Sequence, residues 1–339
     1  MSAPSVAVVI LNWNGKDLLS RFLPSVIKTN YSNLQLIVGD NGSTDGSVAF
    51  VREHFPQVTL ICNDQNYGFA EGYNRVLEQV RADYYILLNS DVEVPENWIR
   101  PVIDIMASDA QIAAAMPKIK WQEDQSKFEY AGAAGGFMDR NAFPFCRGRI
   151  FDTAETDLGQ YNDVKEIFWA SGAAFFIKAA QWQEVGGLDT DLFAHMEEID
   201  LCWRLKNIGY KVVYCPDAEV YHLGAGTLDA KNPHKVFLNF RNNLIIMQKN
   251  LSGAEAILGI TVRMCLDFIA LLQFLLKGET KFAAAVNKAH VQFIKSISKT
   301  ARKKTGKQMP FLQHTGVYHS SIVWAFFIKG IKKFSQLKF

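Results

Sequence analysis

The sequence of 339 residues has few cysteines, and their spacing excludes several classes of protein. The five cysteines form no CxxC pair and no dense disulfide framework; they stand singly at Cys62, Cys146, Cys202, Cys215 and Cys265. The amino terminus also lacks the basic segment and apolar stretch of a secretory signal, because Met1 is followed almost at once by the apolar run from Val6 to Leu11. Both absences predict a protein that works in the cytoplasm.

Two common phosphate-binding motifs are also missing. The chain contains neither a GxGxxG fingerprint nor a GxxxxGK[ST] loop. The first absence argues against a nicotinamide-dependent dehydrogenase. The second leaves any phosphate group to be held by some arrangement other than a P-loop.

Charge of either sign is nearly balanced overall, but it is unevenly distributed. The formal net charge is +2, yet the segment from Lys277 to Phe339 carries thirteen Lys or Arg residues and a single acid, Glu279. The rest of the chain is therefore acidic. A basic tail on an acidic body indicates contact with a phosphate-rich surface, either membrane headgroups or nucleic acid.

What the sequence does contain is an alternation of short β-rich runs with segments of helical period. The predicted strands are Val6 to Leu11, Leu34 to Val38, Val58 to Ile61, Tyr84 to Leu88, Ala173 to Ile177 and Lys211 to Tyr214. Apolar residues recur at helical spacing from Phe69 to Val80 and from Trp98 to Met106. This order predicts an α/β fold with a mixed, mostly parallel sheet flanked by helices.

Other segments depart from this alternation. From Ile119 to Lys165 the chain is polar and rich in glycine, without a clear period, so we expect a long irregular segment over a binding site. A helix is predicted around Glu197 to Ile208, and the chain reads as helical from about Val236 to its end. We therefore expect a catalytic domain over residues 1–235 and a basic helical region over residues 236–339.

Two apolar stretches in that helical region bear on membranes. The run from Ala256 to Leu276 nearly has the length of a span, but Arg263, Asp267 and Gln273 interrupt it, which favours a packed or interfacial helix. Further on, a helical stripe is flanked by lysines; it consists of Trp324, Phe327, Ile328, Ile331 and Phe334. This pattern predicts a helix on an anionic membrane surface, with a core-facing helix as the alternative. Since the aromatics show no exposed stacking pattern, we expect no nucleic acid partner.

The first candidate site residues stand at the ends of predicted strands. Asn12 ends the first strand, and Asp40 follows the second within GDNGSTDGS. In an open α/β sheet ligands bind beyond the carboxyl ends of the strands, where a carboxylate can accept hydrogen bonds from a ribose or a pyrimidine. The neighbouring Ser43 and Asp45 read better as turn and capping residues.

A second group follows the very apolar strand YYILL as Asn89, Ser90 and Asp91. An acid at the end of a buried strand is costly unless it has a partner or a metal. Because Mg²⁺ prefers oxygen ligands together with substrate phosphates, Asp91 is a candidate metal ligand. Its alternative role is to cap the next turn.

Three acids crowd the start of the predicted helix, at Glu197, Glu198 and Asp200. Asp200 is spaced to pair with Arg204, which is a structural role. Mutual repulsion between the other two would raise a pKa toward that of a general base. His222 in VYHLGAG completes the set, with a structural histidine as its alternative.

Together these segments resemble an inverting family 2 glycosyltransferase of the GT-A fold, in the rhamnosyltransferase-like group. The resemblance covers about Val6 to Lys249. It is carried by the order of VVILNWNG, VGDNGSTDGS, NYGFAEGYN, ILLNSDVEV, GAAFFIKAAQWQEVGGLDTDLF, EEIDLCWRLKNIGYKV, YHLGAGT and FRNNL.

The resemblance implies roles for these residues. Asn12 and Asp40 would hold the nucleotide base, and the donor would lie along Asn66, Gly68, Asn74, Asn89, Ser90 and Asp91. Asp91 would be the surviving acid of a DxD-type motif in which Asn89 replaces the first acid. Asp91 and His222 would hold a divalent metal, Mg²⁺ or Mn²⁺, and Glu198 would be the general base.

The implied reaction moves a sugar, with inversion, from a nucleotide diphosphate to a hydroxyl of a glycan or lipid-linked acceptor in cell-surface polysaccharide synthesis. A dTDP-, UDP- or GDP-sugar is the expected donor, with rhamnose favoured, and the protein would sit at the inner face of the cell membrane. Two alternatives remain. One is a nucleotide-sugar-binding protein with a decayed site; the other is a sugar nucleotidyltransferase, although near the first strand only Lys16 offers a basic group for phosphate.

Overall fold

A computed structural model describes residues 3–224, 232–301, 303 and 308–339. Its main sheet has nine strands in the order β11-β13-β6-β12-β4-β1-β2-β3, with β5 pairing with β13. The strands are β1 (Val6–Asn12), β2 (Leu34–Asn41), β3 (Thr59–Asn63), β4 (Tyr84–Leu88), β5 (Val92–Glu93), β6 (Ile112–Trp121), β11 (Lys165–Ile167), β12 (Ala174–Lys178) and β13 (Lys211–His222). The predicted mixed, mostly parallel sheet is confirmed.

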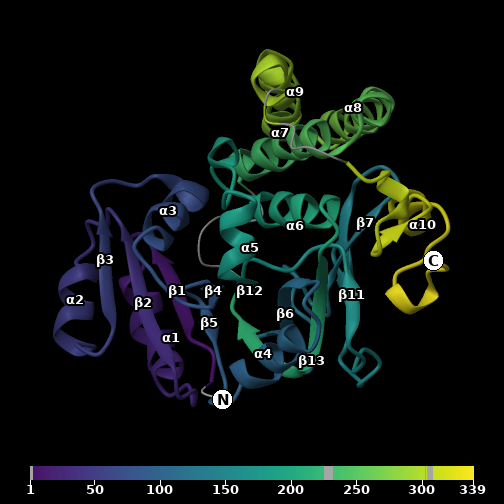
Figure 1. The fold of residues 1–339 in the computed structure, drawn as a ribbon. Coiled ribbons are helices and arrows are strands. Elements are labelled where there is room, and N and C mark those ends of the chain that lie inside the picture. Colours follow the sequence, from purple (N-terminus) through teal and green to yellow (C-terminus); the bar gives the residue numbers. More distant parts are fainter. Residues whose placement is uncertain (1–2, 225–231, 302, 304–307) are drawn as a thin grey trace.

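The helices flank this sheet, as Figure 1 shows. They are α1 (Lys16–Ile27), α2 (Ser47–His54), α3 (Gly68–Leu77), α4 (Ile99–Ser108), α5 (Ala179–Glu184) and α6 (Glu197–Asn207). The strands β1, β2, β3 and β4 run parallel, whereas β12 is antiparallel to both β4 and β6. Every residue of β4 is buried, which explains why this strand reads as a continuous apolar run rather than an alternation.

The segment from Ile119 to Lys165 is not the irregular stretch that its composition predicts. It contains the end of β6 and four short strands, β7 (Gly136–Asp139), β8 (Pro144–Cys146), β9 (Arg149–Ile150) and β10 (Thr153–Ala154). With β14 (Val317–Tyr318) they form a second sheet in the order β10-β9-β8-β7-β14. Strands of two to four residues are too short to show a period in the sequence, and for that reason the prediction was wrong.

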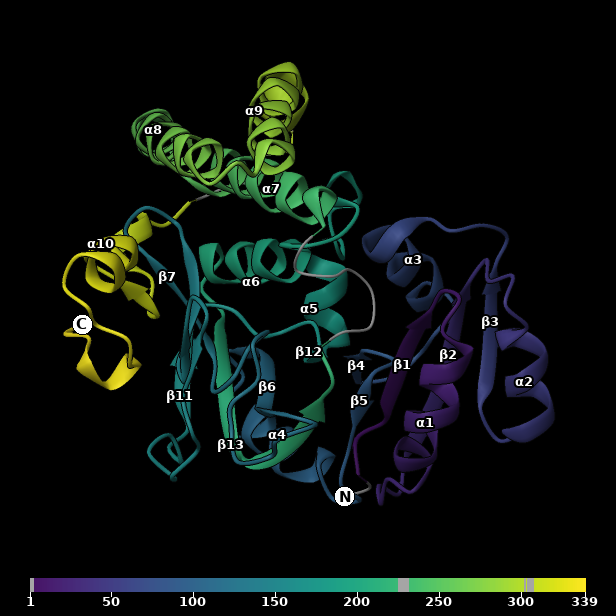
Figure 2. The ribbon, with the colours of Figure 1, turned by 180° about the vertical axis from the view of Figure 1, so that it is seen from behind.

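The carboxyl-terminal region begins with three long helices. They are α7 (Pro233–Asn250), α8 (Gly253–Leu276) and α9 (Thr280–Ala301), and they lie together at one end of the molecule in Figures 1 and 2. Within the part of the chain that the structure describes, α8 is the one helix long and apolar enough to cross a membrane by length and composition. Only 11% of its most apolar stretch is buried.

The prediction that the chain stays helical to its end was wrong. After α9, the described residues contain two 3₁₀ turns, the strand β14 and the six-residue helix α10 (Ile322–Phe327). The apolar stripe expected from Trp324 to Phe334 is therefore not one helical face. Gly330 adopts a left-handed backbone, and Phe334 turns inward to pack its ring 4.7 Å from that of Phe137.

The carboxyl-terminal elements share a core with the main sheet. Leu244 and Met247 of α7, Phe293 of α9 and Ile322 of α10 belong to the same buried cluster as the residues of β1. Buried charges join α7 to α6 as well, because the Lys249 ammonium lies 2.9 Å from the Asp200 carboxylate. The two regions of the chain are therefore packed as one body.

Candidate functional site

Asn12 and Asp40 lie side by side at the carboxyl ends of β1 and β2. They are register partners in the parallel pair, and the Asn12 amide donates a hydrogen bond of 3.1 Å to the Asp40 carboxylate. The other Asp40 oxygen accepts from the backbone N–H of Ser43 at 2.9 Å. Both side chains are buried, and the side-chain oxygen of Asn12, Oδ1, has no hydrogen-bond partner in the described part of the chain. An unpaired acceptor at this position suits a ligand's N–H or O–H group.

Asp91 and His222 are brought together by β5. This strand begins directly after Asp91 and pairs with the end of β13, where His222 is the register partner of Val92. The imidazole Nε2 lies 3.1 Å from Asp91 Oδ1, and the side chain of Asn89 lies 3.5 Å from the same nitrogen. The sequence predicts β13 only as far as Tyr214, so its extension to His222 is a finding of the structure.

Glu129 is a member of this cluster that the sequence analysis did not identify. It stands just before the glycine-rich segment, buried, with Oε1 3.3 Å from His222 Nδ1. Its other oxygen accepts from the backbone N–H of Ala131. The available signal was an acid that precedes AGAAGG, but nothing in the sequence indicates that the bend there returns it to His222.

His222 therefore lies between two carboxylates. Burial alone would lower its pKa, but the charges of Glu129 and Asp91 outweigh burial and raise the pKa to about 10. A divalent cation at Nε2 could replace the proton in balancing these acids, while Glu129 holds Nδ1, as carboxylates do behind metal-bound histidines. No group of three or more potential metal ligands occurs in the described ranges, so protein would supply two ligands, Asp91 and His222. Substrate phosphate and water oxygens would supply the rest.

The paired acids at the start of α6 have raised pKa values. Burial raises the pKa of Glu198 to about 7. Glu197 is more deeply buried, and burial together with repulsion from Glu198 raises its pKa well above the ordinary value. The Glu198 carboxyl carbon lies 4.0 Å from where a Cβ on Gly172 would stand, and the adjacent Ala173 carbonyl accepts from the N–H of Asn89 at 3.0 Å. Glu198 therefore lies in the same region as the segment that carries Asp91.

The loop before α6 is strained and held from α7. Phe193, His195 and Met196 all have positive φ, between 62° and 76°, which non-glycine residues rarely adopt. The Asn242 amide donates to the carbonyls of residues 192, 194 and 195 at 2.7–2.9 Å. Arg241 donates to two carbonyls of the same loop. These contacts define how Glu197 and Glu198 are presented, and they give the FRNNL motif a structural role.

The other candidates show structural contacts of their own. Gly68 has φ 78°, and a Cβ there would stand 2.6 Å from the Phe193 ring. Asn74 exchanges two hydrogen bonds with the backbone of Leu188, at 2.9 and 3.0 Å. Asn66 accepts from the Gly68 N–H and from Asn41. The contacts of Gly68 and Asn74 link α3 to the chain before α6, and those of Asn66 link the start of α3 to β2. Donor contact by these three residues stays a prediction.

The expected structural residues behave as predicted. Asp45 accepts hydrogen bonds from the backbone of Lys16 and Ser47, and burial opposed by these bonds leaves its pKa below the ordinary value. The Asp200 carboxylate pairs with the Arg204 guanidinium at 2.8 Å. Neither acid is available as a free ligand group.

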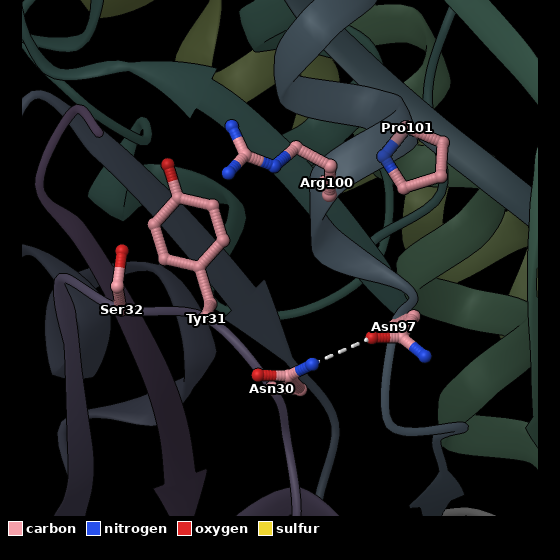
Figure 3. A pocket seen from close by; sticks show the side chains of 6 residues that line it. All are labelled: Asn30, Tyr31, Ser32, Asn97, Arg100 and Pro101. Atoms are coloured by element: carbon pink, nitrogen blue, oxygen red, sulfur yellow. Dashed lines mark hydrogen bonds between the residues drawn. The ribbon is translucent and has the colours of Figure 1, made fainter. Parts of the chain in front are cut away.

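Two surface hollows differ in their relation to this cluster. One, of about 470 Å³, is lined by Asn14 to Leu18, Asp45 and Leu223, which stand close in sequence to Asn12 and His222. The other, of about 400 Å³, is lined by Asn30 to Ser32, Asn97, Arg100 and Pro101, with a hydrogen bond between Asn30 and Asn97 (Figure 3). It precedes β2 rather than following it, and its lining residues are not close in sequence to a candidate site residue on β1, β2 or β13. The first hollow is therefore the one next to the candidate site.

Comparison with known sequences agrees with this arrangement. Residues 7–157 match the family model described as glycosyl transferase family 2. The chain is 27% identical over 261 residues to an N-acetylglucosaminyl-diphospho-decaprenol L-rhamnosyltransferase of Mycobacterium tuberculosis (strain ATCC 25618 / H37Rv). That match covers 73% of this chain and 85% of the relative.

Solved structures have the same fold. GalNAc-T7, solved with UDP, GalNAc and Mn²⁺, aligns with a TM-score of 0.57 at 18% identity, over 74% of this chain and 48% of that one. A mannosyltransferase from Pyrobaculum calidifontis, in complex with GDP-Man and Mn²⁺, aligns with a TM-score of 0.54 at 15% identity, over 86% and 89%. The predicted GT-A fold is confirmed. The chain therefore has the GT-A fold, and over residues 7–157 it is similar to glycosyl transferase family 2.

Proposed function

We propose that this protein transfers a rhamnose-type sugar, with inversion, from a nucleotide diphosphate to a hydroxyl of a glycan or lipid-linked acceptor. The cluster of Asp91, His222 and Glu129 beside an acid of raised pKa, Glu198, is the observation that carries the proposal. The relative from Mycobacterium tuberculosis, an L-rhamnosyltransferase named for a diphospho-decaprenol acceptor, supports both the sugar and the acceptor class.

Glu198 is the proposed general base. A carboxyl group with a pKa of about 7 is a carboxylate in half of the molecules at neutral pH and is basic enough to accept a hydroxyl proton. In the proposed step Glu198 takes the acceptor's proton while the acceptor oxygen attacks the anomeric carbon. The bond from that carbon to the diphosphate breaks, and the nucleoside diphosphate leaves from the opposite face. A single displacement inverts the configuration.

Asp91 and His222 are the proposed ligands of Mg²⁺ or Mn²⁺, with Glu129 orienting the imidazole. Such an ion would neutralise charge on the diphosphate. Asn12 and Asp40 would bind the base or ribose through the unpaired Asn12 oxygen and the Asp40 carboxylate. Asn66, Gly68, Asn74, Asn89 and Ser90 remain proposed neighbours of the donor.

In this proposal residues 1–235 carry out catalysis and residues 236–339 contact the membrane. The basic composition of the second region supports an anionic membrane as its partner, since thirteen basic residues follow α8. We propose that the protein works in the cytoplasm at the inner face of the cell membrane, in the synthesis of a cell-surface polysaccharide.

A transfer assay with paired variants tests this proposal. Purified protein is incubated with dTDP-, UDP- or GDP-sugars and Mg²⁺ or Mn²⁺, and nucleoside diphosphate release is measured with and without membrane extract as the acceptor source. Glu198→Gln should lower kcat by roughly 100-fold or more, since general-base catalysis contributes about that much. Glu197→Gln is the matched control, because a carboxyl that stays protonated is nearly isosteric with the amide.

Two results would oppose the proposal. Release of nucleoside diphosphate by Glu198→Gln at the rate of the wild type would remove the base assignment. A wild-type protein that binds nucleotide sugars but releases no product with any donor or metal would point to a decayed site.

A further inference from the structure

The charged residues of α8 face the interior of the protein. Arg263 and Asp267 are both buried and form an ion pair of 2.7 Å along the helix. The Arg263 guanidinium also donates to Asn243 of α7 at 2.6 Å and lies 3.6 Å above the Phe143 ring, next to β8. Asp267 contacts His290 of α9 at 3.2 Å. The two charges that interrupt the apolar run thus hold one side of α8 against α7, α9 and the second sheet.

The opposite side of α8 is apolar and exposed. Leu272 is nine residues beyond Arg263, which at about 100° per residue places it half a turn away. Its neighbours on this face include Ile257, Leu258, Phe268, Ile269 and Leu276, all exposed, with Ile257 74% and Leu276 90% exposed. We call these six residues the apolar face of α8. A contiguous exposed apolar surface of this kind marks an interaction site.

The basic residues near the apolar face of α8 indicate which partner it binds. Lys277 follows α8 directly, and Lys281, Lys288 and Lys295 are exposed on α9, which packs against α8. The chain from Lys277 onward carries thirteen basic residues and one acid. A second copy would bring the same positive charge to the contact, whereas anionic lipid headgroups are attracted by it.

We infer that α8 lies flat in the headgroup layer of an anionic membrane with its apolar face inserted, and does not span the bilayer. Spanning would withdraw Arg263 and Asp267 from Asn243 and His290 into hydrocarbon, which is unfavourable. The predicted membrane helix around Trp324 is thereby replaced by α8 as the inserted element. This inference rests on the proposed function in taking an anionic membrane as the partner.

Helix α7 contacts both α8 and the loop before α6. On α7, Asn243 contacts Arg263, while the adjacent Asn242 binds the backbone of residues 192–195 before α6. A membrane that orients α8 therefore orients the loop that precedes α6 and its Glu198. This connection suits an acceptor whose hydroxyl is presented at the lipid surface.

The two exposed cysteines provide a test within one molecule. Cys265 is exposed on α8, two residues from Arg263, and Cys62 is exposed on β3 at the far side of the main sheet. Labelling of both thiols by a charged maleimide is followed by mass spectrometry, with phosphatidylglycerol vesicles, with phosphatidylcholine vesicles and with none. Anionic vesicles should slow labelling of Cys265 about tenfold or more and leave Cys62 unchanged. Equal rates at Cys265 in all three conditions would overturn the inference, as would protection that depends on protein concentration alone, since that indicates a second copy.

Flotation with variants separates this surface from catalysis. Ile269→Glu should lower recovery with anionic vesicles about tenfold, whereas Leu158→Glu, a change at an apolar residue 82% exposed away from α8, should not. Donor turnover without membranes should stay unchanged in both variants, so failure of the inference and failure of the proposed function are distinguishable. Vesicle-bound protein should be released at alkaline pH by carbonate; retention would show a spanning helix and contradict the inference.

Discussion

Glu129 and His222 form a contact across 93 residues of sequence, with the Glu129 Oε1 atom 3.3 Å from the imidazole Nδ1. The other ring nitrogen, Nε2, lies 3.1 Å from Asp91. The ring therefore lies between two carboxylates, and Glu129 stands behind the atom pair proposed to bind a metal. This arrangement gives Glu129 a positioning role rather than a place among the ligands.

Glu129→Gln should weaken the metal site without removing it. An amide in place of the carboxylate makes the imidazole a poorer ligand, and a change of this kind typically costs about 10-fold to 100-fold in metal affinity. The Mn²⁺ concentration that gives half-maximal transfer should rise by that factor, while kcat at saturating Mn²⁺ changes less. An unchanged Mn²⁺ dependence, in a variant with the melting temperature of the wild type, would leave Glu129 with a purely structural role.

The pH dependence of transfer should report Glu198. Because its pKa is about 7 and the base must be a carboxylate, kcat should rise with pH through about 7 and level off above it. At about one unit below that pKa, roughly a tenth of the molecules carry the ionised base. A profile that is flat across this range, measured under saturating donor and metal, would assign the base to another group.

Glu198 should also lower the stability of the folded protein at alkaline pH. A carboxyl whose pKa is raised by folding favours the folded state below its unfolded pKa, and this contribution is lost as pH rises through about 7. Glu198→Gln removes the ionisation, so the variant should melt at a higher temperature than the wild type near pH 8. The difference should shrink near pH 5, where the wild-type carboxyl is protonated. Thermal scans at the two pH values make the comparison; a gain that is the same at both would contradict it.

Asn242 should matter for both stability and turnover. Replacing it by Leu, of similar volume, leaves the carbonyls of residues 194 and 195 without their donor, while the carbonyl of residue 192 keeps Arg241. The change should cost about 2–4 kcal/mol in the free energy of unfolding. Urea unfolding measures this cost. The kcat should also fall, because the loop precedes Glu198 directly. Asn287→Leu, on the exposed side of α9, is the matched control and should change neither quantity.

The sequence predicts those parts of the site that depend on strand ends. Asn12, Asp40 and Asp91 follow strands whose apolar runs are long enough to recognise, and parallel strands bring their carboxyl ends to one edge. Glu129 could not be predicted in this way, because its position depends on a chain that returns to β6 through an isolated bridge between Lys120 and Phe128. A single bridge of this kind leaves no periodicity in the sequence.

In the carboxyl-terminal region, too, sequence periodicity predicts some elements and not others. The structure has a helix where the apolar run predicts one, and Arg263 and Asp267, four residues apart, lie on its buried side. The stripe that ends at Phe334 has an equally regular spacing, but Gly330 ends the helical course and Phe334 packs into the second sheet. Spacing alone does not reveal which apolar residues find partners in the core.

The proposed metal at Asp91 is tested most directly by calorimetric titration of UDP, GDP and dTDP into the protein with Mn²⁺ and with EDTA. One of the three should bind with Mn²⁺ and lose at least about tenfold in affinity with EDTA, and Asp91→Asn should lose it even with Mn²⁺. Glu198→Gln should bind as the wild type does. Equal affinity of the wild type and Asp91→Asn for every nucleotide, or binding that is insensitive to Mn²⁺, would contradict the account.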